Sequence, residues 1–191
     1  KYVSKEELLR TADHVVLVLP YSPESHHTIG AKEIALMKPT ATLINIARGG
    51  IVDDLLVYCI EQNKTYMLVV NASNIEKDWN WISSHNTNGV EMHNISDKTA
   101  LLAVQGPKAT EYMQQLTNMD ITNLAYYTFA KGTFAGVENV LVSATGYTGA
   151  GGVEIYFEDK NGEAQKIWDE VFRVGAPHGM KPIGLAARDT L

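Results

Sequence analysis

The chain has 191 residues, of which 45% are hydrophobic and 20% are charged, and its formal net charge at pH 7 is −6. These ordinary values argue against a disordered chain, and the negative charge, with no Lys/Arg cluster to override it, argues against nucleic acid as a partner. Cys59 is the only cysteine, which excludes an internal disulfide framework and multi-cysteine metal sites. No apolar run approaches the roughly 18 residues of a membrane span, so we expect a cytoplasmic protein with no membrane partner.

The first fifty residues alternate between helical and strand patterns. Ser4 followed three residues later by Glu7 is a capping-box pattern, which predicts a short helix from Lys5 to about Arg10. Two later runs are continuously apolar, as in strands covered on both faces of a parallel sheet, and a segment with helical spacing lies between them. We expect strands at 15–19 and 42–46 and a helix at 29–37. This order is half of a doubly wound α/β unit.

After residue 50 the pattern becomes that of antiparallel strands and amphipathic helices. Two strands on either side of Gln62-Asn63-Lys64 predict a hairpin, and the last three predicted strands indicate a meander. The expected strands are 51–58, 65–70, 90–95, 101–104, 126–132, 139–144 and 153–157. The expected helices are 74–84, 107–116 and 163–174.

Three patterns bear on cofactors and metals. The glycine-rich run from Gly146 to Gly152 lies between two predicted strands and contains no lysine, so we predict a hairpin loop there rather than a phosphate loop. No Gly-x-Gly-x-x-Gly lies between a strand and a helix, so NAD is not expected. The histidines lack chelating spacing, since the neighbours His26 and His27 point apart in a loop or strand, and no metal site is expected.

One motif near residue 50 is specific. It is Asn45-Ile46-Ala47-Arg48-Gly49-Gly50-Ile51-Val52-Asp53, preceded by Val18-Leu19-Pro20 and Ile34-Ala35-Leu36-Met37-Lys38-Pro39. With these motifs, residues 1–53 resemble the D-isomer-specific 2-hydroxyacid dehydrogenases. The resemblance implies that Arg48 matches the arginine that holds the substrate carboxylate, a task for which a guanidinium fork is well shaped.

A second set of motifs covers the remaining three quarters of the chain. It comprises residues 49–58, 68–78, 103–109, 146–154 and 184–189. With these motifs, residues 49–191 resemble the aminomethyltransferase (T-protein) of the glycine cleavage system. The resemblance implies that tetrahydrofolate accepts a methylene group from an aminomethyl-lipoyl carrier protein, and that ammonia is released.

The same resemblance implies the residues of a tetrahydrofolate site. Asp54 matches the catalytic aspartate beside the reacting region of the folate, and Glu154 matches the glutamate that pairs with the pterin. One carboxylate can accept two parallel N–H bonds from the amino-pyrimidinone edge of a pterin. The other matching positions around the folate are Tyr58, Asn71, Tyr126, Tyr127, Tyr147 and Arg188.

Two of these assignments have structural alternatives. Asp53-Asp54 follows Gly-Gly and is also typical of a turn, and Tyr126-Tyr127 is equally typical of a half-buried strand pair.

The two resemblances meet at Gly49-Gly50-Ile51-Val52-Asp53, which either family could have contributed. We therefore expect a hybrid with mixed α/β (α+β) fold: a Rossmann-like parallel segment at 1–48 and an antiparallel T-protein-type unit at 49–191, as two domains or merged into one. The hybrid hypothesis predicts a folded, catalytically inactive chain with remnants of a tetrahydrofolate site. The alternative is an aminomethyltransferase-type tetrahydrofolate-binding protein, which would have the lipoyl carrier protein as a partner if it is active.

Overall fold

The computed structural model describes residues 2–18, 25, 28–38, 41–45 and 53–188. These residues form two compact units, Lys1–Met92 and His93–Leu191. The predicted domain boundary between residues 48 and 49, and most of the predicted junction, lie outside the described residues and stay predictions. Among the described residues, no helix is long and apolar enough to cross a membrane.

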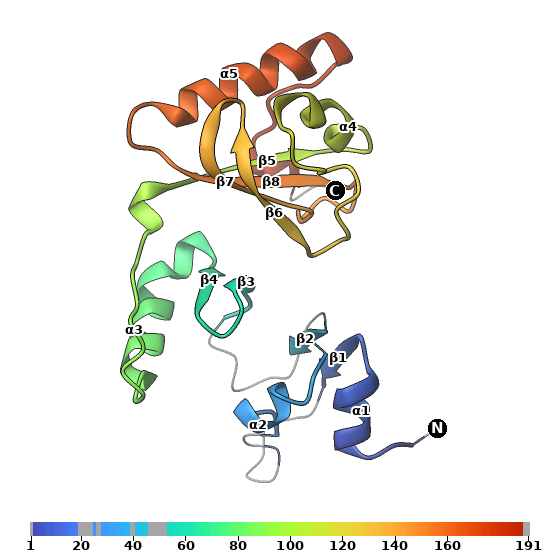
Figure 1. Ribbon diagram of the computed structural model, residues 1–191, viewed down its shortest axis with the longest axis vertical. Helices are drawn as coiled ribbons and strands as arrows, with labels where there is room; N and C mark the ends of the chain where they lie inside the picture. Colours follow the sequence, from blue (N-terminus) through green and yellow to red (C-terminus); the bar gives the residue numbers. More distant parts are fainter. Residues whose placement is uncertain (1, 19–24, 26–27, 39–40, 46–52, 189–191) are drawn as a thin grey trace. The chain divides into compact units, whose positions relative to one another are not determined.

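The first unit begins with a parallel pair of strands (Figure 1). Its elements are α1 (Lys5–Thr11), β1 (His14–Leu17), α2 (Ala31–Ile34) and β2 (Thr42–Asn45). The predicted cap is confirmed, because Ser4 Oγ accepts a hydrogen bond of 3.1 Å from the backbone N–H of Glu7. The predicted order of helix, strand, helix, strand is also confirmed, although α2 is shorter than the expected 29–37.

A hairpin and a helix follow in the same unit. β3 (Leu56–Glu61) pairs antiparallel with β4 (Thr65–Val69), as predicted, and η1 (Ala72–Asn74) leads into α3 (Ile75–His85). The predicted strand at 90–95 is wrong. The Asn86 side chain accepts the Val90 N–H at 2.9 Å and donates to the Val90 carbonyl at 2.6 Å, so it satisfies backbone groups that a strand partner would otherwise bind.

The second unit is a four-stranded antiparallel sheet with helices on one face (Figure 1). Its strand order is β5-β8-β7-β6, so the predicted meander of the last three strands is confirmed and β5 is added beside β8. The strands are β5 (Thr99–Gln105), β6 (Phe129–Phe134), β7 (Val137–Ser143) and β8 (Gly152–Glu158). The helices are η2 (Ser96–Lys98), α4 (Ala109–Met113), η3 (Gln114–Leu116), α5 (Glu163–Gly175), η4 (Ala176–His178) and α6 (Leu185–Arg188).

The predicted strand at 126–132 begins too early. Tyr127 has a φ of 64°, in the left-handed region that a strand residue does not adopt, and β6 begins only at Phe129. Tyr126 and Tyr127 therefore form a turn in front of β6, and the alternative of a half-buried strand pair is wrong for them.

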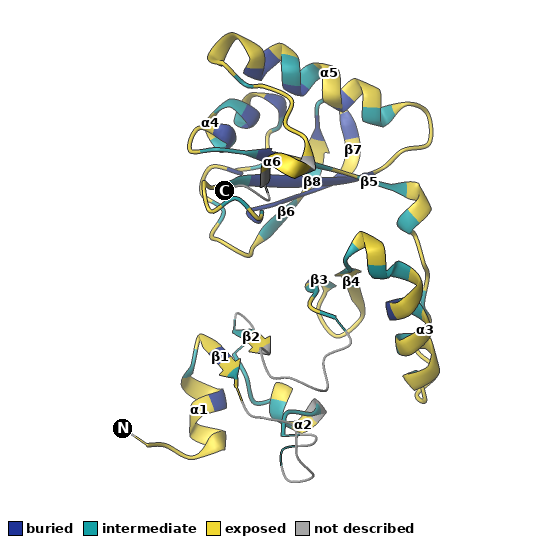
Figure 2. Cartoon of the chain, turned by 180° about the vertical axis from the view of Figure 1, so that it is seen from behind, coloured by how far each residue is buried: buried dark blue, intermediate teal, exposed yellow. Residues whose placement is uncertain are grey.

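The core of the second unit lies between the sheet and the helices α4 and α5 (Figure 2). Alternate residues of β8, namely Val153, Ile155 and Phe157, pack there with Ile167 and Val171 of α5. Burying each such side chain contributes about 1.5–3 kcal/mol to stability. Because side chains alternate along a strand, the residues between them face the opposite side of the sheet, where the candidate site lies.

Candidate functional site

A buried carboxylate lies on the sheet face opposite the helices. Glu154 is in β8, directly opposite Ala103 of β5 and Ser143 of β7, and it is 9% exposed. Its Oε2 accepts a hydrogen bond from the Tyr156 hydroxyl at 3.0 Å and another from the Thr145 hydroxyl. Two hydroxyl donors offset much of the cost of burying this carboxyl group. Both hydroxyls donate to Oε2, and because a carboxylate has about four lone-pair sites, two donors do not exhaust its acceptor capacity.

Three exposed tyrosines belong to the same unit. The rings of Tyr126 and Tyr127 meet edge to face with centroids 4.4 Å apart, and the Tyr127 N–H donates to the Ala144 carbonyl at 3.0 Å. Burial raises the pKa of the Tyr127 phenol, and a hydrogen bond with Tyr126 and the charges of Tyr126, Tyr147 and Glu154 raise it further. The structure thus brings together Glu154 and three of the four tyrosines that the sequence predicted, namely Tyr126, Tyr127 and Tyr147, and Tyr127 stays a protonated donor at neutral pH.

The loop before β8 is held by one glutamine. Gln105 Nε2 donates to the carbonyls of Thr145 and Val153, both at 3.1 Å, and Gln105 Oε1 accepts from the Thr148 hydroxyl at 2.9 Å. This loop joins the antiparallel strands β7 and β8, so the predicted hairpin loop is confirmed. By fixing Thr145, Gln105 also fixes one of the two hydroxyl donors of Glu154.

A second group of predicted residues lies in the first unit, beside the β3–β4 hairpin. Asp54 precedes β3 and is exposed, and Asn71 follows β4. Asn71 Nδ2 donates to the backbone carbonyl of Asp54 at 3.0 Å and lies 3.4 Å from the Oδ1 of the Asp54 side chain. Asn71 Nδ2 also donates to Asp53 Oδ1 at 2.8 Å. The structure therefore brings Asp54 and Asn71 together.

The remaining predicted residues are Tyr58, Arg188 and Arg48. Tyr58 is only 4% exposed and is the buried residue of β3, which makes it a packing residue of the hairpin. Arg188 ends α6, but its side chain lies outside the described part of the chain, as does Arg48. Across the described ranges, no group of three or more His, Cys, Asp or Glu side chains could hold a metal ion.

The residues that support these groups lie outside the set predicted from the sequence. Tyr156 could have been found, because it lies two positions after Glu154 and a strand places such residues on one face. Asp78 could also have been found, because a charged residue three positions after Ile75 falls within the apolar stripe of a predicted helix, where a buried carboxyl group is unusual. Thr145 and Asn74 carry no such signal, because their roles depend on contacts with distant parts of the chain.

The comparisons with known proteins agree with the second resemblance. The family model described as the GCVT N-terminal domain matches residues 30–191. The chain belongs to this family. The motifs predicted that the T-protein-like segment starts at residue 49, but the family match begins 19 residues earlier, at residue 30. It therefore also covers residues 30–48, which are part of the segment that resembles the dehydrogenases.

Several curated relatives of this chain are named aminomethyltransferases. One from Flavobacterium psychrophilum is 66% identical over 143 residues, and one from Bacteroides fragilis is 63% identical over the same length; each alignment covers 75% of this chain and 39% of the relative. One from Desulforamulus reducens is 41% identical over 175 residues, which is 90% of this chain and 47% of that protein. The chain thus spans less than half the length of these relatives.

Proposed function

We propose that this chain is the tetrahydrofolate-binding part of an aminomethyltransferase of the glycine cleavage type. The observation that supports this most is Glu154, a buried carboxylate whose two hydroxyl donors both bind Oε2 and whose charge acts on the exposed Tyr127. The amino-pyrimidinone edge of a pterin offers two parallel N–H donors, which suit one carboxylate. Flat aromatic surface beside that carboxylate suits the pterin ring.

In this proposal the two groups of residues have different tasks. Glu154, with Tyr126, Tyr127 and Tyr147, binds and orients the pterin. Asp54, held by Asn71, is the proposed catalytic carboxylate of the first unit, and Arg188 is a further proposed folate contact of the second. Tetrahydrofolate then accepts a methylene group from an aminomethyl-lipoyl carrier protein, and ammonia leaves.

The hybrid hypothesis for residues 1–48 is the second candidate. Of the features that it predicts, the described residues contain the parallel pairing of β1 with β2, which is typical of a doubly wound unit. The family match that begins at residue 30 favours the first candidate over much of the same segment. A hybrid would fold without transferring methylene groups, whereas the first candidate predicts ammonia release from the aminomethylated carrier protein in the presence of tetrahydrofolate.

Calorimetric titration with a stable folate analogue tests the binding site. Glu154→Ala is expected to weaken binding at least about tenfold, because a hydrogen bond to a charged group contributes about 1.5–3 kcal/mol. Arg48→Ala is the control and should leave the affinity unchanged, since only Glu154 belongs to the proposed pterin site. Equal losses in the two variants would contradict the proposal. NAD, titrated in parallel, should bind no more tightly than about 100 µM.

A further inference from the structure

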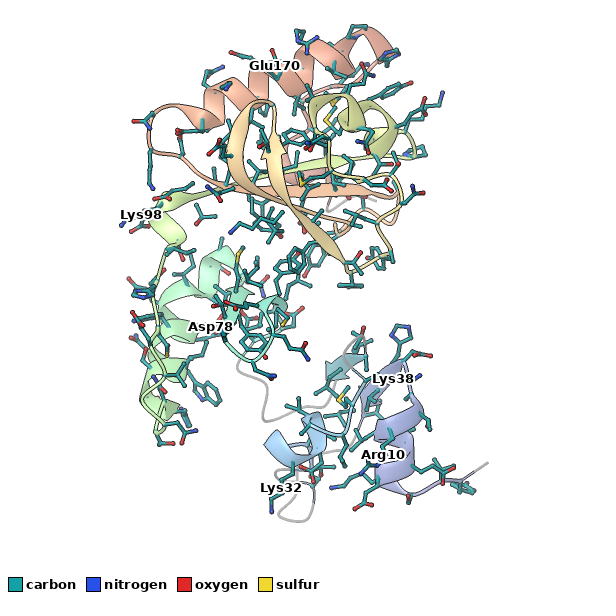
Figure 3. All side chains as sticks on the ribbon, in the orientation of Figure 1. Arg10, Lys32, Lys38, Asp78, Lys98 and Glu170 are labelled. Atoms are coloured by element: carbon teal, nitrogen blue, oxygen red, sulfur yellow. The ribbon has the colours of Figure 1, made fainter. Side chains whose placement is uncertain are left out.

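A buried carboxyl group in α3 lacks a conventional hydrogen-bond donor among the residues that the structure describes. Asp78 is 2% exposed, and Figure 3 shows it on the side of α3 that faces the β3–β4 hairpin. Within the described residues, neither carboxyl oxygen has a conventional donor. The Lys77 Nζ lies 4.0 Å from Asp78 Oδ1, beyond hydrogen-bond distance, and the Lys77 side chain is half exposed. An ionised carboxylate would be unstable at such a position.

The carboxyl group that acts on Asp78, through a hydrogen bond and through its charge, is that of Asp53. Asp53 Oδ1 accepts from Asn71 Nδ2 at 2.8 Å and from the Asp54 N–H at 2.9 Å. Its Oδ2 accepts from Asn74 Nδ2 at 3.0 Å. Asn74 is the residue immediately before α3, and Asp78 lies in the first turns of that helix. Asp53 is therefore well supplied with donors, whereas among the described residues the charged neighbours of Asp78 are Asp53 and, at 4.0 Å, the Lys77 ammonium.

We propose that Asp78 carries a proton, donates its O–H to Asp53, and thereby acts as a positioning residue for Asp54. The assignment of Asp54 rests on the proposed function, but the carboxyl pair does not. Two neighbouring carboxyl groups out of water cannot both ionise at low cost, and a single proton between them turns repulsion into a hydrogen bond. The proton belongs on Asp78, because Asp53 already accepts three N–H donors.

The electrostatics of the pair agree with this arrangement. Burial raises the pKa of Asp78, the hydrogen bond with Asp53 and the charge of Asp53 raise it further, and only Lys77 acts in the opposite direction. Burial also opposes the ionisation of Asp53, but hydrogen bonds from Asn74, Asp78 and Asn71 outweigh it and lower the pKa of Asp53 to about 2. A carboxyl group whose pKa is raised by folding stabilises the fold at low pH and loses that contribution as pH rises.

The consequence for Asp54 follows from its backbone contacts. Asp53 accepts the Asp54 N–H, and Asn71 donates to the Asp54 carbonyl at 3.0 Å. The backbone of Asp54 is thus held on both sides by groups that Asp78 keeps in place, while its side chain stays exposed. Ionisation of Asp78, or removal of its side chain, is expected to weaken both of these backbone hydrogen bonds of Asp54.

Two variants of the full chain separate the proton from the shape of the side chain. Asp78→Asn keeps an N–H donor for Asp53 at every pH, Asp78→Ala removes the donor, and Glu76→Gln on the exposed side of α3 is the matched control. Infrared spectra at neutral pH should contain a protonated-carboxyl C=O band in the wild type and in Glu76→Gln that Asp78→Asn abolishes. Persistence of that band in Asp78→Asn, or its absence from the wild type, would overturn the carboxyl pair.

The positioning role has its own readouts. Hydrogen exchange of the Asp54 amide should accelerate at least tenfold in Asp78→Ala and less than about threefold in Asp78→Asn. The wild type should also lose stability as pH rises through the pKa of Asp78, and Asp78→Asn should not. Unchanged exchange in Asp78→Ala would overturn the role, and if that variant does not fold, an equal protection factor of the Asp54 amide in the wild type at low and high pH would do so. Failure of folate to bind leaves these readouts intact and contradicts only the proposed function.

Discussion

Glu154 and Asp78 are both buried carboxyl groups, yet their surroundings differ. Glu154 receives hydrogen bonds from the hydroxyls of Thr145 and Tyr156, whereas the hydrogen-bonding neighbour of Asp78 in the described part of the chain is another carboxyl group, that of Asp53. A buried polar group is stabilised when its donors are supplied, so the first arrangement suits ligand binding and the second suits storage of a proton.

At the residue scale, Thr145→Val tests the support of Glu154. The substitution keeps the shape of the side chain but removes the hydroxyl donor, so the free energy of unfolding should fall by about 1–3 kcal/mol. Thr133→Val, at an exposed position of β6, is the control and should change stability by less than about 0.5 kcal/mol. Chemical denaturation measures both, and equal losses in the two variants would show that the Thr145 hydroxyl does not support Glu154.

At the element scale, the start of β8 depends on a glycine that no side chain can replace. Gly152 has a φ of 131°, and a Cβ built there would overlap the carbonyl oxygen of Val104. Gly152 lies opposite Gln105 in the β5–β8 ladder. The close approach of β5 to β8 therefore requires glycine at this position.

Gly152→Ala is accordingly expected to destabilise the sheet more than Gly151→Ala. Gly151 also has a positive φ, of 77°, but a Cβ there would meet nothing within 4 Å. The control should lower the free energy of unfolding by about 1 kcal/mol, from backbone strain alone, and Gly152→Ala by at least about 2 kcal/mol. Thermal unfolding provides the comparison, and a smaller loss at residue 152 than at 151 would refute the close-approach argument.

At the scale of the whole molecule, the two units differ in how much core they contain. The buried hydrophobic cluster around Phe134, Ile155 and Ile167 lies entirely within the second unit. The buried hydrophobic side chains described for the first unit are Leu9, Val15 and Tyr58. Stability of a domain depends mainly on buried apolar area, so the second unit should fold independently.

Residues 93–191, produced alone, are therefore expected to unfold in a single cooperative transition. Phe134→Ala should lower the free energy of unfolding of this fragment by about 3–5 kcal/mol, and by a similar amount for the same unit within the full chain. Differential scanning calorimetry measures both. A fragment without a cooperative transition would mean that the second unit depends on the first.

Local patterns in the sequence determined many of the elements. The apolar runs around Gln62-Asn63-Lys64 correctly predicted the β3–β4 hairpin, and helical spacing predicted α5, whose Ile167, Val171 and Val174 are buried. The motifs from residue 49 onward indicated the aminomethyltransferase family. These features depend on residues close in sequence, where the periods of 2 and 3.6 residues are set by backbone geometry.

The tertiary structure alone decided the contacts between distant residues. It placed β5 beside β8, gave Tyr127 a left-handed turn, and left 90–95 outside any strand. It also placed the Asp53 carboxyl group beside that of Asp78, and the Thr145 hydroxyl beside the Glu154 carboxylate. A carboxyl group becomes a ligand site or a proton store according to the donors and the burial that the folded chain provides, and no period in the sequence encodes which distant side chain will provide them.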